Sequence, residues 1–128
     1  MIIRSLQDVE KGEFFVNFGN GTSHRLLTSK DQMGFTLCYT MMEPGKESHQ
    51  EYRNHLEACF CLSGRGEIED ADGNIFPIEP GVLYALDKHD RHFLRSGNDE
   101  PLVLVSVFNP ALTGTEVHKF TEEGASSY

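Results

Sequence analysis

The segment from Gly45 to Glu57 carries a dense run of polar and ionisable side chains directly before an apolar run. If Glu57 begins a strand with its side chain inward, it shares a face with Cys59 and Cys61, because strand side chains alternate between faces. A carboxylate would then lie in an otherwise apolar interior. Burying it without a partner costs several kcal/mol, so we expect a metal ion or another cation beside Glu57.

A second group of such side chains surrounds Tyr84. The turn Asp87–Arg91 can bring the chain back so that His92 lies beside Tyr84 on the next strand, where both could meet Glu57. A carboxylate, a phenolate and an imidazole suit Fe²⁺ or a similar borderline divalent ion, with positions left open for water or substrate. His89 lies in the same charged turn, and the residues alone do not choose between it and His92.

Each of these residues also has an ordinary structural explanation. Glu57 alone fits a surface charge at the end of a strand. Tyr84 alone fits a core aromatic residue with a satisfied hydroxyl group. The histidines of the charged turn fit solvated side chains.

The elements that must position these groups are short strands. Twelve glycines and five prolines fall between runs rich in Val, Ile, Phe, Tyr and Leu, which predicts an all-β domain of short antiparallel strands. An Asp-Gly turn within 67–75 indicates a hairpin. One short helix is expected at Ser5–Lys11. The expected strands are Arg25–Leu27, Gly34–Met42, Glu57–Leu62, Gly66–Asp70, Asn74–Ile78, Gly81–Leu86, Phe93–Arg95 and Leu102–Phe108.

Both faces of the run Ala58–Leu62 are apolar, so we expect one face in the barrel interior and the other against a second sheet or subunit. The run 119–128 is a polar tail, which we expect either to be disordered or to fold over a site.

Composition limits the classes of function. The 128 residues are 38% hydrophobic, enough for the core of one domain. Charges near the N-terminus interrupt any signal peptide, and no apolar run approaches about 18 residues, so we expect a cytoplasmic protein. Three cysteines cannot all pair within the chain, which favours reduced thiols. A net charge of −9 opposes nucleic acid and anionic membranes as partners.

Several strings resemble known motifs. Glu57 with Gly64 seven residues later, and Pro80-Gly81 followed by an inward residue and a histidine, look like the two metal motifs of the cupin superfamily. Within that superfamily, the strings resemble the ectoine synthase family from Met1 to about His118. The strings that carry this likeness are Asn54–Ala58, Leu86–His92 and, most specifically, Val107–His118.

The resemblance implies a jelly-roll-like cupin barrel over residues 1–128, usually assembled as a head-to-tail homodimer. Its reaction closes a small acetylated diamino acid, N-γ-acetyl-2,4-diaminobutyrate, to ectoine with loss of water, in compatible-solute biosynthesis. The matching metal ligands are Glu57, Tyr84 and His92, which selects His92 over His89. They would hold Fe²⁺, or another divalent ion such as Zn²⁺.

The resemblance also implies residues that contact the substrate and move protons. The substrate-contacting positions are Arg25, Cys38, Thr40, Tyr52, Ser106, Phe108 and His118. Arg25 is suited to clamping a carboxylate, because its planar fork matches two oxygens. Tyr84, Glu116 and His118 are the candidates for proton transfer, with His118 favoured because imidazole titrates near neutrality.

This chain departs from the family at three positions. It has Gly21 where the family usually has Trp, Cys38 where the family has Asn or His, and Ser106 where the family has Cys. We therefore expect a pocket without an aromatic wall at Gly21 and with weaker hydrogen bonding at Cys38. Three alternatives remain open: a related cyclase with a different substrate, an iron cupin that oxygenates or isomerises a small acid, and a non-catalytic ligand-binding cupin.

Overall fold

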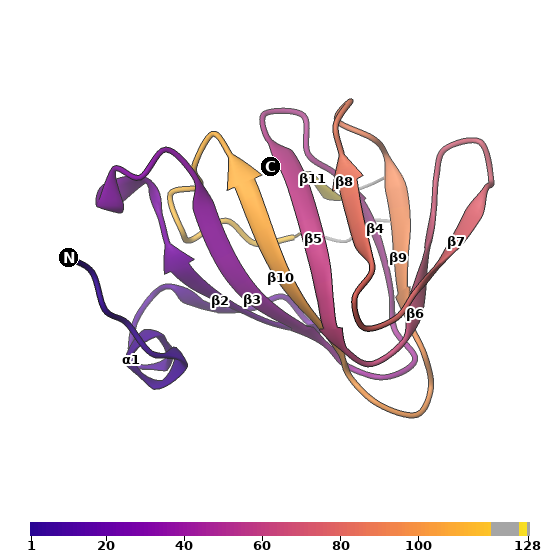
Figure 1. Ribbon diagram of the computed structural model, residues 1–128, viewed down its shortest axis with the longest axis horizontal. Helices are drawn as coiled ribbons and strands as arrows, with labels where there is room; N and C mark the ends of the chain where they lie inside the picture. Colours follow the sequence, from indigo (N-terminus) through magenta and orange to yellow (C-terminus); the bar gives the residue numbers. More distant parts are fainter. Residues whose placement is uncertain (119–125, 128) are drawn as a thin grey trace.

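The protein is built from two β-sheets, as the computed structural model of residues 1–118 and 126–127 shows (Figure 1). The six-stranded sheet has the order β1 (Phe15–Asn17), β2 (Gly21–Leu27), β3 (Thr36–Met42), β10 (Leu102–Asn109), β5 (Leu56–Ser63) and β8 (Leu83–Leu86). The five-stranded sheet has the order β11 (Ser126–Ser127), β4 (Glu47–Glu51), β9 (His92–Ser96), β6 (Gly66–Glu69) and β7 (Ile75–Ile78). All pairings are antiparallel except that of β11 with β4.

The all-β prediction with one short N-terminal helix is confirmed. Helix α1 (Leu6–Glu10) begins after Ser5, whose hydroxyl accepts a hydrogen bond from the Asp8 amide at 3.1 Å. The Asp8 carboxylate accepts one from the Ser5 amide at 2.9 Å, which completes a capping box. A 3₁₀ turn, η1 (Ser29–Asp31), is the other helical segment of the described chain, and no helix there is long and apolar enough to cross a membrane.

All eight expected strands are present, and the sequence prediction missed β1, β4 and β11. Strand β4 gives no hydrophobic signal, because the side chains that it buries are Ser48 and Gln50. The predicted hairpin is β6–β7, whose turn is held by the Asp70 carboxylate accepting from the amides of Asp72 and Asn74, each at 2.9 Å. Of the polar tail expected over 119–128, the structure describes only 126–127.

Strand β10 organises the interior because it lies between β3 and β5. Its register pairs Ser106 with Cys38 on one side and with Cys59 on the other. Alternate residues of β10 are buried, so Leu104, Ser106 and Phe108 all point into the space between the sheets. The same alternation on β5 buries Glu57, Cys59 and Cys61.

The opposite face of β5 and β8 is apolar and exposed. Phe60 is 43% exposed, and its partner across the strands, Leu83, is 62% exposed. Leu62 and Leu56 extend the same outer face along β5. No second sheet of the described chain covers this surface, so the second sheet expected over it is not found there.

Gly21 begins β2 at a point of close backbone approach. A Cβ atom built there would collide with the carbonyl oxygen of Met41, whereas a Cβ at Gly12 would meet nothing within 4 Å. Strand pairing therefore leaves no room for a side chain at position 21.

We predict that Gly21→Ala lowers the free energy of unfolding by about 1–3 kcal/mol, because the strands must separate to admit the methyl group. Gly12→Ala is the matched control and should have little effect. Chemical denaturation of both variants measures the difference. Equal stability of the two variants would show that β2 relaxes without cost.

Candidate active site

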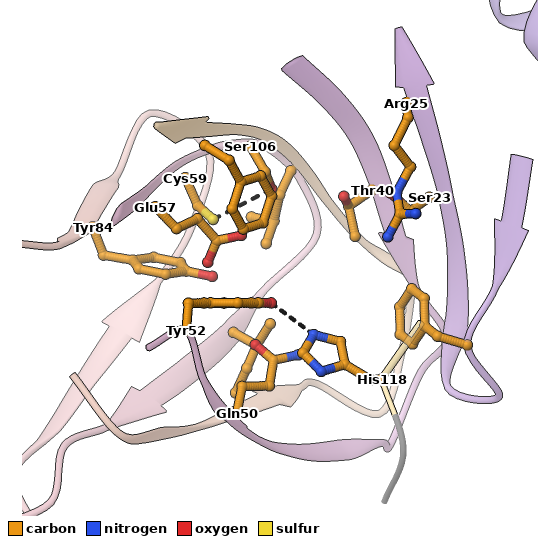
Figure 2. A pocket seen from close by; sticks show the side chains of 14 residues that line it. Ser23, Arg25, Thr40, Gln50, Tyr52, Glu57, Cys59, Tyr84, Ser106 and His118 are labelled. Carbon is orange, nitrogen blue, oxygen red and sulfur yellow. Dashed lines mark hydrogen bonds between the residues drawn. The ribbon is translucent and has the colours of Figure 1, made fainter. Parts of the chain in front are cut away.

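A cavity of about 40 Å³ lies between the two sheets (Figure 2). Its walls are formed by Phe18, Ser23, Arg25, Thr40, Gln50, Tyr52, Glu57, Cys59, Tyr84, Leu94, Leu104, Ser106, Phe108 and His118. This volume holds roughly three water molecules.

One wall brings Glu57 and Tyr84 together, as the sequence predicted. The register of β5 with β8 pairs Cys59 with Tyr84, and Glu57 lies two residues before Cys59 on the same face. Glu57 is only 6% exposed, and its Oε1 atom has no hydrogen-bond partner among the described residues. Burial raises the pKa of Glu57 to about 8, and burial with the nearby Cys59 and Glu57 also raises the pKa of Tyr84.

His92 is fully buried, and it contacts this cavity through Gln50. Its Nδ1 donates to the carbonyl oxygen of Asp90 at 2.9 Å, so Nε2 keeps its lone pair. The Oε1 atom of Gln50, on the cavity wall, is placed 3.2 Å from Nε2, and because this nitrogen carries no hydrogen, the pair forms a hydrogen bond only with the Gln50 amide turned so that its NH₂ group donates. Burial lowers the pKa of His92, which keeps the imidazole neutral. His89 instead donates to the carbonyl oxygen of Tyr52 at 2.8 Å and supports a loop.

The opposite end of the cavity is cationic. Arg25 is 3% exposed, and its Nε donates to the Ser23 hydroxyl at 2.9 Å. Its Nη1 donates to the carbonyl oxygen of Gly114 at 3.0 Å. Thr40 lies beside Ser23 in the register of β2 with β3. Figure 2 shows the Arg25 guanidinium and the Glu57 carboxylate at opposite ends of the cavity.

Tyr52 and His118 close another side of the cavity. The Tyr52 hydroxyl and His118 Nε2 are hydrogen-bonded at 2.7 Å, and the ring of Phe108 packs edge-on against Tyr52 at 5.1 Å. Burial, followed by the positive charge of Arg25, lowers the pKa of His118 to about 3. His118 is therefore a neutral imidazole at physiological pH.

Besides His92, two predicted site residues, Cys38 and Glu116, are not on the cavity wall. Cys38 is buried opposite Arg25 in the strand register, and burial raises the pKa of its thiol to about 11. The Glu116 carboxylate accepts from the amides of Thr113 at 2.9 Å and Gly114 at 2.8 Å. Burial alone would raise the pKa of Glu116, but these backbone hydrogen bonds lower it. Glu116 thus holds the loop whose Gly114 carbonyl contacts Arg25.

The expectation of a missing aromatic wall is wrong. Gly21 is not a lining residue, and Phe18 supplies an aromatic ring, 6.4 Å from the ring of His118. The reversal through Gly19, which has a φ of 90°, follows Phe18 directly and is a signal that the sequence analysis did not use. Gln50 and Ser23 were also missed, because polar residues on unrecognised strand positions carry no hydrophobic pattern.

No group of three or more His, Cys, Asp or Glu side chains is placed to hold a metal ion within the described residues. The acidic wall offers a different donor set, one carboxylate and one phenol, with an imidazole beyond Gln50. The structure thus brings together two of the three predicted metal ligands.

The sequence and the fold of this chain resemble those of known proteins. The family model described as ectoine synthase matches residues 1–127. The chain belongs to the ectoine synthase family. It is 48% identical over 118 residues to the L-ectoine synthase of Vibrio parahaemolyticus, covering 92% of both chains. It is 51% identical over 128 residues to that of Desulfatibacillum aliphaticivorans, covering 98% of this chain and 95% of the relative.

Solved structures agree with this family. A crystal structure of ectoine synthase from P. lautus matches with a TM-score of 0.84 and 36% identity, over 98% of this chain and 96% of that one. A Cupin 2 conserved barrel domain protein from Salinispora arenicola matches with a TM-score of 0.68 and 23% identity, over 84% of this chain and 87% of that one. This likeness supports the fold only. The predicted cupin barrel is confirmed. As a member of the ectoine synthase family, the chain is a hydro-lyase of compatible-solute biosynthesis.

We predict a pH-dependent stability from the buried Glu57 in the metal-free protein. Between about pH 4.5, the ordinary pKa of a glutamate, and about pH 8, Glu57 is ionised in the unfolded chain but protonated in the folded one. The free energy of unfolding therefore falls as the pH rises through this range. Glu57→Gln removes this loss, and its stability relative to wild type should therefore grow by a few kcal/mol across that range and then level off.

Urea denaturation at several pH values measures this difference. Glu100→Gln, at an exposed surface position, is the matched control. A stability difference for Glu57→Gln that does not change with pH would contradict the assigned burial.

Proposed function

We propose that this ectoine synthase family member closes N-γ-acetyl-2,4-diaminobutyrate to ectoine with loss of water in the cavity between Arg25 and Glu57. The observation that carries the proposal is the placement of a buried guanidinium and a buried carboxyl group, whose Oε1 has no partner among the described residues, at opposite ends of one cavity. One end suits the substrate carboxylate and the other suits the centre where the amide reacts. Family membership gives the reaction.

We infer that Glu57, Tyr84 and His92 hold a divalent ion, Fe²⁺ or another such as Zn²⁺. The unpartnered Oε1 of Glu57 supports this, since a buried carboxylate oxygen calls for a cation. The Nδ1–H of His92 donates to a backbone carbonyl, the arrangement that usually orients a metal-binding imidazole through its other nitrogen. A divalent ion bound there supplies Lewis-acid polarisation of the amide oxygen. His92 can bind the ion only after the Gln50 side chain has moved away from its Nε2 atom.

The substrate carboxylate binds Arg25, whose guanidinium is fixed by Ser23 and by the Gly114 carbonyl. This anchor folds the flexible substrate so that its α-amine lies near its own acetamide carbon. Such positioning lowers the entropic cost of bringing the amine and the acetamide carbon together. Thr40, Ser106 and Phe108 shape the space between the two ends, and Glu116 acts by holding the Gly114 loop.

Ring closure forms a C–N bond and breaks the C–O bond of the amide, and both amine protons leave with the oxygen as water. The sequence favours His118 for proton transfer because imidazole titrates near neutrality. A pKa lowered to about 3 makes it a weak base, however, and its Nε2 at 2.7 Å from the Tyr52 hydroxyl suits it to orienting Tyr52. Tyr84 keeps its proton in the metal-free cavity, since burial raises the pKa of its hydroxyl, and it can donate to the departing oxygen only as a neutral phenol and not as a phenolate ligand. The cavity thus offers an acid at Tyr84, and His118 contributes by orienting Tyr52.

We also propose that two copies associate through the outer face of β5 and β8. Phe60 and Leu83 pair on that face and are 43% and 62% exposed in one chain. Contiguous exposed apolar surface of this kind is typical of protein interfaces. A cytoplasmic location fits the three free cysteines.

The metal assignment predicts that Glu57→Ala, Tyr84→Ala and His92→Ala each sharply reduce bound iron. His49→Ala should leave iron content nearly unchanged, because His49 stacks on Phe93 at 4.0 Å away from the cavity wall. Elemental analysis of protein loaded anaerobically with Fe²⁺ gives the metal content. Normal iron in Glu57→Ala would refute the assignment.

The carboxylate anchor predicts a loss of about 10- to 100-fold in kcat/KM for ring closure in Arg25→Lys, because the planar two-point contact is removed. The loss should lie mainly in KM, as expected for binding that is equal in ground and transition states. Arg53→Lys, at an exposed arginine, is the control. A change of less than twofold in Arg25→Lys would place the carboxylate elsewhere.

The interface proposal predicts that Phe60→Glu and Leu83→Glu shift the protein from dimer to monomer, since each buries a charge in the contact. Ile75→Glu places the same charge at a 56% exposed apolar residue of the other sheet and should leave the assembly intact. Light scattering coupled to size-exclusion chromatography reports the mass. A wild-type monomer, or a dimer unaffected by both variants, would rule out this interface.

A further inference from the structure

One of the three buried cysteines shares the cavity wall with the unpartnered carboxylate. Cys59 lies two residues after Glu57 on the inner face of β5 and pairs with Tyr84 across the strands. It is 1% exposed, and its Sγ lies 3.3 Å from the Ser106 hydroxyl. Figure 2 shows the sulfur beside the Glu57 carboxylate on the wall that Tyr84 completes.

The other two cysteines are placed differently. The Cys61 thiol donates to the carbonyl oxygens of Ser63 at 3.5 Å and Gly64 at 3.8 Å, and it does not line the cavity. Cys38 lies next to Arg25, at the cationic end. Cys59 is therefore the thiol that lies on the cavity wall beside the Glu57 carboxyl group.

We propose that Cys59 is a sulfur ligand of the metal ion held by Glu57 and Tyr84. The inference rests on the metal centre proposed above and extends its donor set. Glu57, Cys59 and Tyr84 are already adjacent, whereas His92 must first exchange its contact with Gln50. A second observation points to the same ligand: the Oε1 atom of Glu57 is buried on this wall and has no hydrogen-bond partner among the described residues.

Coordination replaces the S–H bond of Cys59 by a sulfur–metal bond, and the proton leaves to solvent. A thiolate is a soft donor, which favours Zn²⁺, Co²⁺ and Fe²⁺ over Mg²⁺. The added ligand still leaves positions open on an ion that accepts more than four donors. Cys59 thus biases the centre toward the softer divalent ions.

Cobalt substitution tests this ligand directly. Co²⁺ titrated into metal-free wild-type protein should give visible ligand-field bands and a near-ultraviolet sulfur-to-cobalt charge-transfer band. Cys59→Ser should bind Co²⁺ but lose the charge-transfer band. Cys61→Ser, two residues along the same face, is the matched control and should keep it.

A measurement on the unaltered protein keeps the test independent of how the variants fold. X-ray absorption at the zinc edge of the Zn²⁺-loaded wild type should show one sulfur neighbour at roughly 2.3 Å. Stoichiometric binding with oxygen and nitrogen neighbours alone, or a charge-transfer band that survives in Cys59→Ser, would overturn the role of Cys59 and leave the metal centre standing. Failure of wild type to bind either ion would overturn both.

Discussion

The structure depends on one constraint, which is that the Glu57 carboxylate is held in the interior between two sheets without a protein cation beside it. Burial raises the pKa of Glu57 to about 8, and the Arg25 guanidinium lies at the other end of the cavity. The apolar and weakly polar side chains around Glu57 do not offset the negative charge that its carboxyl group carries when ionised. The energetic cost of this carboxylate is the physical reason for expecting a bound ion, and the arrangement of Tyr84, Cys59 and His92 follows from it.

A second feature is that the Arg25 guanidinium is held in place by hydrogen bonds to its neighbours. Ser23 and the Gly114 carbonyl hold Arg25, and Glu116 in turn holds the Gly114 loop through two amides. Preorganised groups of this kind need little rearrangement when charge develops during a reaction. Gln50 is the side chain that has to move for the proposed metal centre, because it stands between His92 and the cavity.

Much of this architecture can be predicted from the sequence, and the failures have physical causes. Strand alternation groups Glu57 with Cys59 and Cys61 on one face, as observed, but both faces of that strand are apolar, so the sequence leaves open which face points inward. The inward Ser106 and Phe108 are expected from the family likeness and not from alternation. Strand β4 escapes prediction since it buries Ser48 and Gln50, and a polar strand looks like a loop. The prediction at Gly21 failed for another reason. The family likeness placed position 21 on the pocket wall, but the pairing of β2 with β3 puts the Met41 carbonyl oxygen where a side chain of residue 21 would lie. The choice of His92 over His89 needed the family likeness, and the structure adds that His92 is the buried one.

The central claim is that a metal ion replaces the proton of Glu57. Isothermal titration calorimetry of Zn²⁺ binding to the metal-free protein, in buffers of different ionisation enthalpy, counts the protons released. Burial holds the pKa values of Tyr84 and Cys59 well above their ordinary range. The number of protons that these two residues release on Zn²⁺ binding therefore stays constant near neutral pH. The account predicts that release falls by nearly one proton between about pH 6.5 and about pH 9, with a midpoint near pH 8. A proton count that does not change over this range would contradict it.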